Sequence, residues 1–273
     1  RAPFMTCHIG LVAASPRINI TSQRGARNIS FRQTRVGIQH SGRSQGNITL
    51  SELGKKVNSS WRFYRKMHWM ASAAGRADLL NTHQDYKGLP VVSAARNMRT
   101  TIYAREYTSG LIKIMSQTLG QEDEFGVPDV GEQLELRPGN WFGNYARAVT
   151  QVLLSSRFHP QSVGIQAEVR SEVPISSGLA SSAALEVAFA SLLNRVFSLG
   201  LSRREIAEAS YKAEREVMGI PCGRLDQYGS ALGGLTIIEN RPPYHTEVLK
   251  GKGLFFVVVD SGIRHATSSI HPV

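Results

Sequence analysis

The sequence has little cysteine, and its two cysteines are not grouped. Cys7 and Cys222 lie far apart in the 273 residues, without the spacing of a zinc site or of a disulfide framework. Long apolar runs are also missing, because the longest, around Phe255 to Val259, has only the length of a strand. We therefore expect no zinc site, no disulfide framework and no membrane span, and we expect a reducing cytoplasm as the compartment.

Acidic residues are almost absent from the first 70 residues. This segment holds twelve Lys or Arg and one acid, Glu52, so that its net charge of +11 equals the formal charge of the whole chain. The other 203 residues carry 20 bases and 20 acids. The globular part therefore has no field that attracts a polyanion, and we expect no nucleic acid as its partner.

Residues 1–69 also lack a sustained helical or strand period, and three interpretations of them stay open. An Arg- and Ser-rich segment with little acid is typical of an organellar transit peptide, and also of a basic arm that touches RNA or DNA. The interpretation we favour is read-through from an upstream start, with the native protein beginning near Met67 or Met70, because the composition changes abruptly there. We accordingly expect a non-native or disordered extension, 1–69, and one domain, 70–273.

From Ser72 onward, apolar runs alternate with turn signals, as in an α/β or α+β domain. A strand-like run that ends before Pro174 is followed by a helix that Gly200 closes. The next helix starts with a capping box of Ser202 and Glu205. The pattern also predicts two hairpins, one from residues 100–105 and 111–116 and one from residues 234–239 and 245–249. We expect a mixed sheet covered by the two helices.

A loop of small residues, Pro174–Ala184, joins the predicted strand to the first of these helices. The backbone N–H groups of such a loop, with the positive end of a helix, bind phosphate without any side-chain charge. No Gly-Lys-Ser/Thr follows, so this is not a Walker A loop. Taken alone, Ser181 or Ser182 is better explained as a helix N-cap.

Two further segments concentrate polar side chains. The segment from Gly75 to Gly88 contains Arg76, Asp78, His83 and Asp85, a set that suits a polyhydroxylated ligand but also a solvated loop. The segment from Glu214 to Gln227 places Asp226 after a glycine-rich turn, where an ordinary N-cap is the alternative.

These three segments, in this order, resemble the signatures of the GHMP kinases, and in particular of their galactokinase branch. The loop Pro174–Ala184 is similar to the second family signature. Arg76, His83 and Asp85 match the galactokinase signature, although Thr82 stands in place of its Glu and Ala74 in place of its Pro. The string from Gly219 to Gln227 is similar to Gly-x-Pro-Cys-Gly-x-Met-Asp-Gln, with Glu214 at the separation of an upstream Glu.

The resemblance implies a kinase that uses ATP and Mg²⁺ to phosphorylate a sugar. The residues it implies for ATP are Pro174, Gly178, Leu179, Ala180, Ser181, Ser182 and Ala183, with Trp141 near the adenine. It implies Ser182 and Glu214 as ligands of Mg²⁺. For the sugar it implies Asp226 as the group that accepts the proton of the acceptor hydroxyl, Arg76 to keep Asp226 ionised or to neutralise the transferred group, and His83, Asp85 and Gly223 in the pocket.

The resemblance covers residues 72–273 and leaves two questions. Thr82 puts galactose itself in doubt but leaves a polyol acceptor expected. The third family signature belongs to a C-terminal domain, and the sequence stops at Val273 before it, so we expect a truncated GHMP kinase N-terminal domain. The alternatives are a mevalonate or homoserine type of kinase and a sensor that binds sugar and ATP without turnover. We expect a small-molecule partner and treat a monomer as plausible.

Overall fold

The computed structural model describes residues 67–81, 84–155, 163–250 and 257–259. The chain divides into two units, and the larger one, Trp61–Leu254 with Asp260–Val273, holds every described helix and strand. In the other unit only residues 257–259 are described, and they lie in no helix or strand. Most of the predicted extension, 1–66, lies outside the described residues, so its three interpretations stay predictions.

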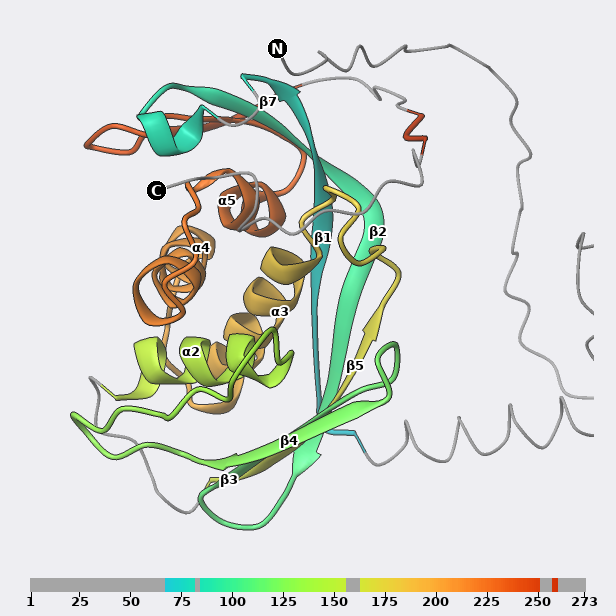
Figure 1. The fold of residues 1–273 in the computed structure, drawn as a ribbon, viewed down its shortest axis with the longest axis vertical. Helices are drawn as coiled ribbons and strands as arrows, with labels where there is room; N and C mark the ends of the chain where they lie inside the picture. The colour runs from blue at the N-terminus through green and yellow to red at the C-terminus, as the bar shows by residue number, and fades with distance from the viewer. Residues whose placement is uncertain (1–66, 82–83, 156–162, 251–256, 260–273) are drawn as a thin grey trace, which may run out of the picture. The chain divides into compact units, whose positions relative to one another are not determined.

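A mixed seven-stranded sheet runs through the larger unit (Figure 1). The strands follow the order β4-β3-β5-β2-β6-β7, and β1 pairs with β2. Among the described pairs only β3 with β5 is parallel. The strands are β1 (Trp69–Leu80), β2 (Val91–Glu106), β3 (Leu111–Ser116), β4 (Gln121–Gly126), β5 (Ile165–Ser171), β6 (Leu235–Ile238) and β7 (Thr246–Leu249).

Strand β2 is long enough to pair with two strands along the same edge. It pairs with β5 over Thr100–Glu106 and with β6 over Val91–Ala94. The predicted hairpin of residues 100–105 and 111–116 is therefore wrong, because β5 lies between β2 and β3. The predicted hairpin of residues 234–239 and 245–249 is confirmed as β6 and β7.

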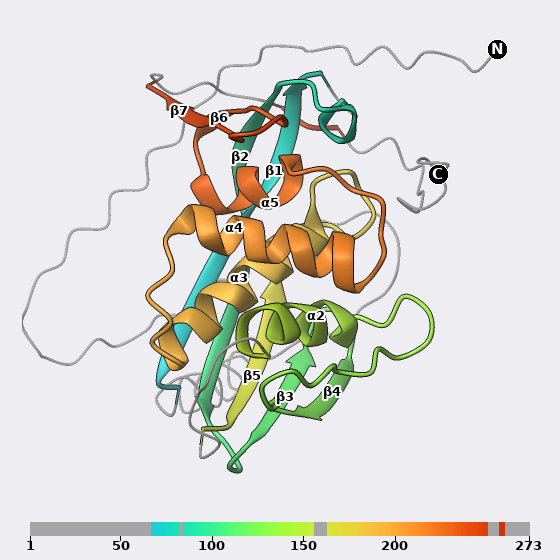
Figure 2. The same ribbon diagram turned by 90° about the vertical axis from the view of Figure 1, so that its left-hand side faces the viewer.

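The helices cover one face of this sheet, with α3 next to β1 and β2 and with α4 on its outer side (Figures 1 and 2). The predicted capping box is present: the Ser202 hydroxyl accepts from the Glu205 N–H and the Glu205 carboxylate accepts from the Ser202 N–H. The helices are α2 (Gly143–Leu154), α3 (Ser181–Val196), α4 (Arg203–Lys212), its π-helical continuation η2 (Ala213–Val217) and α5 (Leu225–Leu232); a short 3₁₀ helix, η1 (Asp85–Lys87), precedes β2.

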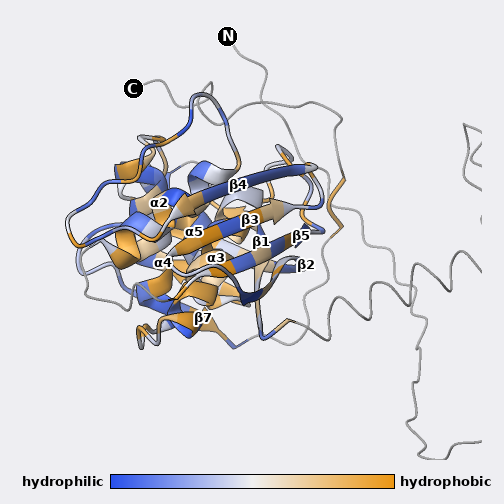
Figure 3. Cartoon of the chain, turned by 90° about the horizontal axis from the view of Figure 1, so that it is seen from below, coloured by the Kyte–Doolittle hydropathy of each residue, from blue (hydrophilic) through white to orange (hydrophobic). Residues whose placement is uncertain are grey.

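The core lies between the helices and the sheet. Helix α3 is rich in alanine, and its buried Ala183, Ala184 and Ala188 let its backbone lie close to the strands. At the edge of the sheet, β4 is strongly hydrophilic (Figure 3), which disfavours pairing with another chain. No helix in the described ranges is both long and apolar enough to cross a bilayer. The predicted class, a mixed sheet packed against helices, is confirmed.

Candidate functional site

The loop of small residues enters α3 through an unusual backbone conformation. Ser176, Gly178 and Ala180 all have positive φ, at 55°, 72° and 57°. The N-cap of α3 is Ala180, and no side chain accepts a hydrogen bond there. Ser181 and Ser182 are therefore the first helical residues, and their interpretation as N-caps is wrong. The first N–H groups of α3 thus lack a side-chain cap, which is the arrangement that binds an anion at a helix start.

Arg76 connects this loop with the start of α5. It lies in β1 with its side chain 9% exposed. Its Nη1 donates to the Gly178 carbonyl at 2.7 Å, and its Nε and Nη2 donate to Asp226 Oδ1 at 2.9 and 2.5 Å. Burial alone lowers the pKa of Arg76, but the carboxylates of Asp226 and Asp78 outweigh it and raise that pKa. The guanidinium is therefore a fixed cation between two segments that are far apart in the sequence.

Asp226 stands in the first turn of α5, and its side chain is 30% exposed, so it is open to a ligand. The N-cap of α5 is Arg224, which rules out a capping role for Asp226. A carboxylate in the first turn is favoured by the helix dipole, and the bonds from Arg76 fix its orientation.

Asp85 and Asp78 lie near Arg76 and Asp226. Asp85 Oδ2 accepts from the Leu225 N–H at 3.2 Å, so η1 is tied to the start of α5. Asp78 Oδ1 lies 3.4 Å from Arg76 Nε. Burial, with the charges of Asp226 and Asp85, raises the pKa of Asp78 to about 6 against the opposing effect of Arg76. His83 lies outside the described residues, and its predicted place stays a prediction.

Gly223 packs directly against Asp85. A Cβ at this glycine would stand 2.1 Å from Asp85 Oδ2, a distance that no real contact allows. The predicted Gly223 thus shapes the site by leaving room for the carboxylate. The sequence placed both residues in the site but could not show that they touch.

Buried carboxylates lie behind the start of α3. Glu214, in η2, is 6% exposed and accepts hydrogen bonds from Gln227 Nε2 and from Ser182. Burial, together with the charge of Asp226, raises the pKa of Glu214 to about 7. Ser182 and Glu214, predicted as a pair, are therefore neighbours.

Glu186 was not predicted from the sequence. It is fully buried in α3, and its Oε2 accepts from Gln227 Nε2 at 3.1 Å. Burial and the charge of Glu214 raise its pKa well above the usual range. The only signal in the sequence was a carboxylate within the apolar run of residues 183–193. Gln227 thus joins two buried acids, one of which touches Ser182.

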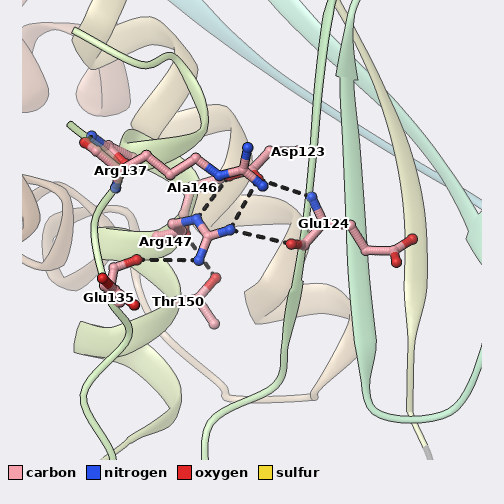
Figure 4. Close-up of polar contacts among 8 residues, drawn as sticks. Asp123, Glu124, Glu135, Arg137, Ala146, Arg147 and Thr150 are labelled. Atoms are coloured by element: carbon pink, nitrogen blue, oxygen red, sulfur yellow. Dashed lines mark hydrogen bonds and ion pairs between the residues drawn. The ribbon is translucent and has the colours of Figure 1, made fainter. Parts of the chain in front are cut away.

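Trp141 precedes α2 and lies beside Arg137, which belongs to a different group of side chains around Asp123 and Arg147; Figure 4 shows that group. Asp123 Oδ2 and Oδ1 accept from Arg147 Nε and Nη2 at 2.8 and 2.9 Å, and Arg137 lies 2.7 Å from the same carboxylate. The Arg137 guanidinium covers the Trp141 ring at 5.3 Å. This network, with the Asp123 side chain fully buried, fixes the segment before α2. A contact of Trp141 with the adenine stays a prediction.

The site therefore joins an uncapped helix start, a fixed arginine, an accessible carboxylate and a buried acid beside a serine. Two family models match the chain: "GHMP kinases N terminal domain" over residues 144–234 and "Galactokinase galactose-binding signature" over residues 62–106. Residues 144–234 are therefore similar to the N-terminal domain of the GHMP kinases. Residues 62–106 are similar to the galactose-binding signature of the galactokinases, and the curated relatives that the chain matches include galactokinases.

These relatives are matched over half their length. The chain is 30% identical over 196 residues to a galactokinase of Haemophilus influenzae (strain PittGG). This match covers 71% of this chain and 50% of the relative. It is 33% identical over 202 residues to a galactokinase of Chloroflexus aggregans. This match covers 72% of this chain and 50% of the relative. The chain thus spans about half the length of the curated relatives it matches.

Solved structures agree with this assignment. Lactococcus lactis galactokinase complexed with galactose superposes with a TM-score of 0.60 at 25% identity, covering 71% of this chain and 50% of that one. The mevalonate kinase of Methanococcus jannaschii, at 23% identity and a TM-score of 0.57, shares the fold; it covers 68% of this chain and 57% of that one.

Proposed function

We propose that this chain supplies the phosphate loop and the acceptor site of an ATP-dependent sugar kinase that transfers the γ-phosphate of ATP to a sugar hydroxyl. The observation that carries the proposal is Arg76, which binds the loop at Gly178 and the accessible carboxylate of Asp226 at the same time. One side chain thereby fixes the distance between a phosphate-binding helix start and a base. The matched galactokinases support a sugar as the acceptor.

The loop residues Pro174 to Ala183 would hold the ATP phosphates through their backbone. Gly178 has open space where a Cβ would stand, and the uncapped N–H groups of α3 follow it. Such groups bind phosphate without a formal charge of their own. Trp141 would contact the adenine.

Mg²⁺ fits the pair of Ser182 and Glu214. Their hydroxyl and carboxylate are the hard oxygen ligands that Mg²⁺ prefers, and a buried carboxylate whose pKa is raised to about 7 is one that a cation stabilises. No group of three or more His, Cys, Asp or Glu in the described segments is arranged to hold a metal. Mg²⁺ needs none, because it takes most of its ligands from substrate phosphates and water. When bound, it would neutralise charge on the phosphates.

The side chains of this chain then divide the reaction between them. Asp226 accepts the proton of the sugar hydroxyl, whose oxygen forms a bond to the γ-phosphorus while the bond to ADP breaks. Arg76 orients Asp226 through its two hydrogen bonds to Oδ1. Phosphoryl transfer has a loose transition state, so the main contribution of the protein is to hold the hydroxyl, the base and the phosphate in line.

The sugar would lie against Asp85 and Gly223, with His83 as a further contact. Asp85 is already held by the Leu225 N–H, and its packing on Gly223 leaves it one fixed position. A fixed acceptor of this kind selects hydroxyl groups by geometry. We also propose that the protein is a monomer, that it acts in the cytoplasm and that its acceptor is a small polyol.

Replacing the base tests the mechanism. Asp226→Asn keeps the shape of the side chain but cannot take the proton, and we expect kcat to fall by about 10²–10⁴-fold. The measurement is ADP release with ATP and a sugar in excess. Asp129→Asn, at an exposed carboxylate of a loop, is the control and should retain the parental rate. Turnover within about twofold of the parent would remove Asp226 from this role.

The acceptor is tested with a panel of galactose, other hexoses, mevalonate and homoserine. Sugar-dependent ADP release supports the proposal. ADP release with only mevalonate or homoserine would instead indicate a kinase of the mevalonate or homoserine type. Saturable binding of ATP and sugar without any ADP would show a sensor.

A further inference from the structure

The larger unit has a hollow that none of the proposed active-site residues lines. It is a hollow of about 530 Å³ between β1, β2, α3, the start of α4 and the last turn of α5. Three arginines line it: Arg96 and Arg99 from β2 and Arg203 from the first turn of α4. None of its lining residues is Asp or Glu. A concave surface with three cations and no lining acid favours an anion, because the walls focus the positive potential into it.

The guanidinium groups are the strongest donors that this hollow offers. Arg99 is held in place, since its Nε donates to Ser72 Oγ at 2.8 Å and its Nη2 to the Ser72 carbonyl at 2.9 Å. Arg96 Nε is buried and has no hydrogen-bond partner within the described ranges. A buried N–H of this kind costs free energy until an acceptor reaches it. Arg203 is exposed and adds a third charge at the rim.

The hydroxyl groups of the lining are already used. Ser230 Oγ donates to the Ala74 carbonyl at 2.6 Å, and Ser191 Oγ donates to the Val187 carbonyl at 2.7 Å. Neutral recognition of a sugar would need free hydroxyl or carboxylate groups, and the lining has few of either. The chemistry of this hollow is therefore cationic.

We infer that this hollow is a second binding site, which takes the phosphate group of a small organic phosphate. A phosphomonoester carries close to two charges and three terminal oxygens, which matches three guanidinium groups, whereas a carboxylate engages one. The volume lies within the range of small-molecule pockets and leaves room for an organic group beside the phosphate. Arg76, Asp226, Ser182 and Glu214 do not line it, so the inference stands whether or not the chain is a kinase.

Calorimetric titration with glycerol 3-phosphate tests the inference, with inorganic phosphate, glycerol and acetate as further probes. Saturating ATP is present throughout to occupy the loop before α3. We expect saturable binding of glycerol 3-phosphate, weaker binding of inorganic phosphate and none of glycerol or acetate. Arg203→Gln and Arg96→Gln should each weaken binding by about tenfold or more, because a charge-assisted hydrogen bond is lost in each.

The control is Arg195→Gln, which removes an exposed arginine of α3 outside the hollow and should leave the affinity unchanged. Arg203 is also exposed, so its variant folds even if that of Arg96 does not. If inorganic phosphate binds as tightly as glycerol 3-phosphate, the result would support the phosphate site. It would contradict a contact between the hollow and the organic group. Absence of saturable binding, or equal weakening by Arg195→Gln and Arg203→Gln, would overturn the inference.

Discussion

At the scale of single residues, Arg76 determines how the two ends of the site meet. Its planar guanidinium donates three hydrogen bonds, one to a carbonyl and two to the same carboxylate oxygen. A lysine has one compact ammonium group and could not span both partners. Strand β1 contacts α5 and carries Arg76, and the loop reaches this side chain through the Gly178 carbonyl. The position of the Asp226 carboxylate therefore depends on a side chain 150 residues away.

A pH titration of Mg·ATP binding tests Glu214. Its pKa of about 7 means that this carboxyl is mostly protonated at pH 6 and mostly ionised at pH 8. Because a cation needs the ionised form, we expect affinity to rise with pH, by about tenfold over these two units. Glu214→Gln should bind more weakly at both values.

ATP itself also takes up a proton in this range, so the test is the difference between the two proteins. The parent should show a steeper dependence on pH than Glu214→Gln. Glu216→Gln, at an exposed neighbour, is the matched control and should behave as the parent. Equal slopes in the parent and in Glu214→Gln would show that Glu214 does not hold the cation.

At the scale of elements, the site depends on how η1 meets α5. The helix dipole at the start of α5 and the Leu225 N–H both favour the Asp85 carboxylate there. The glycine-rich turn before α5 lets η1 approach, since any side chain at position 223 would occupy the place of that carboxylate. The string that resembles the family pattern thus has a steric reason for one of its glycines.

Gly223→Ala tests this contact. The new methyl group would displace Asp85 and break its bond to the Leu225 N–H, so we expect a loss of about 1–3 kcal/mol in the free energy of unfolding. Sugar affinity should fall as well. Urea denaturation and sugar titration measure the two effects. Gly126→Ala is the control, because its Cβ would meet only the Gly110 carbonyl, at 3.9 Å. Equal results for the two variants would contradict the proposed steric role.

The ion pair of Asp123 with Arg147 connects β4 with α2 and fixes the segment that carries Trp141 (Figure 4). Removing one charge leaves the other buried without its partner, so Asp123→Asn should lower the free energy of unfolding by about 3–5 kcal/mol. Chemical denaturation measures this loss in the free energy of unfolding. Glu122→Gln breaks the neighbouring exposed pair with Lys113 and should cost less than about 1 kcal/mol. A small loss for Asp123→Asn would mean that the network does not support α2.

At the scale of the whole molecule, charge is divided unevenly along the chain. Residues 1–66 carry twelve bases and one acid, and the rest of the chain is neutral. Affinity for heparin or duplex DNA, if the chain has any, should therefore fall steeply with salt and disappear on deletion of residues 1–66. Retention on a heparin column at several salt concentrations measures this. Retention that survives the deletion would place the polyanion site in the described domain instead.

Much of the fold could be predicted from local patterns. The capping box at Ser202 and the hairpin of β6 and β7 were predicted because each rests on residues close together in the sequence. The pairing of β2 with β3 was predicted wrongly, since two neighbouring apolar runs look like a hairpin although β5 separates them. Glu186 was missed because a buried acid is recognised only by its neighbours, which come from η2 and α5.

The sequence by itself indicated which residue types the proposed site contains: a loop of small residues before a helix, Arg76, Asp85, Glu214 and Asp226. Local preferences and turn residues act over a few positions, and the sequence displays them directly. Only the tertiary structure decided that Ala180, and not a serine, starts α3, that Gly223 makes room for Asp85, and that Arg76 joins Gly178 to Asp226. Those contacts span long separations, and packing selects them from many partners that the sequence allows equally.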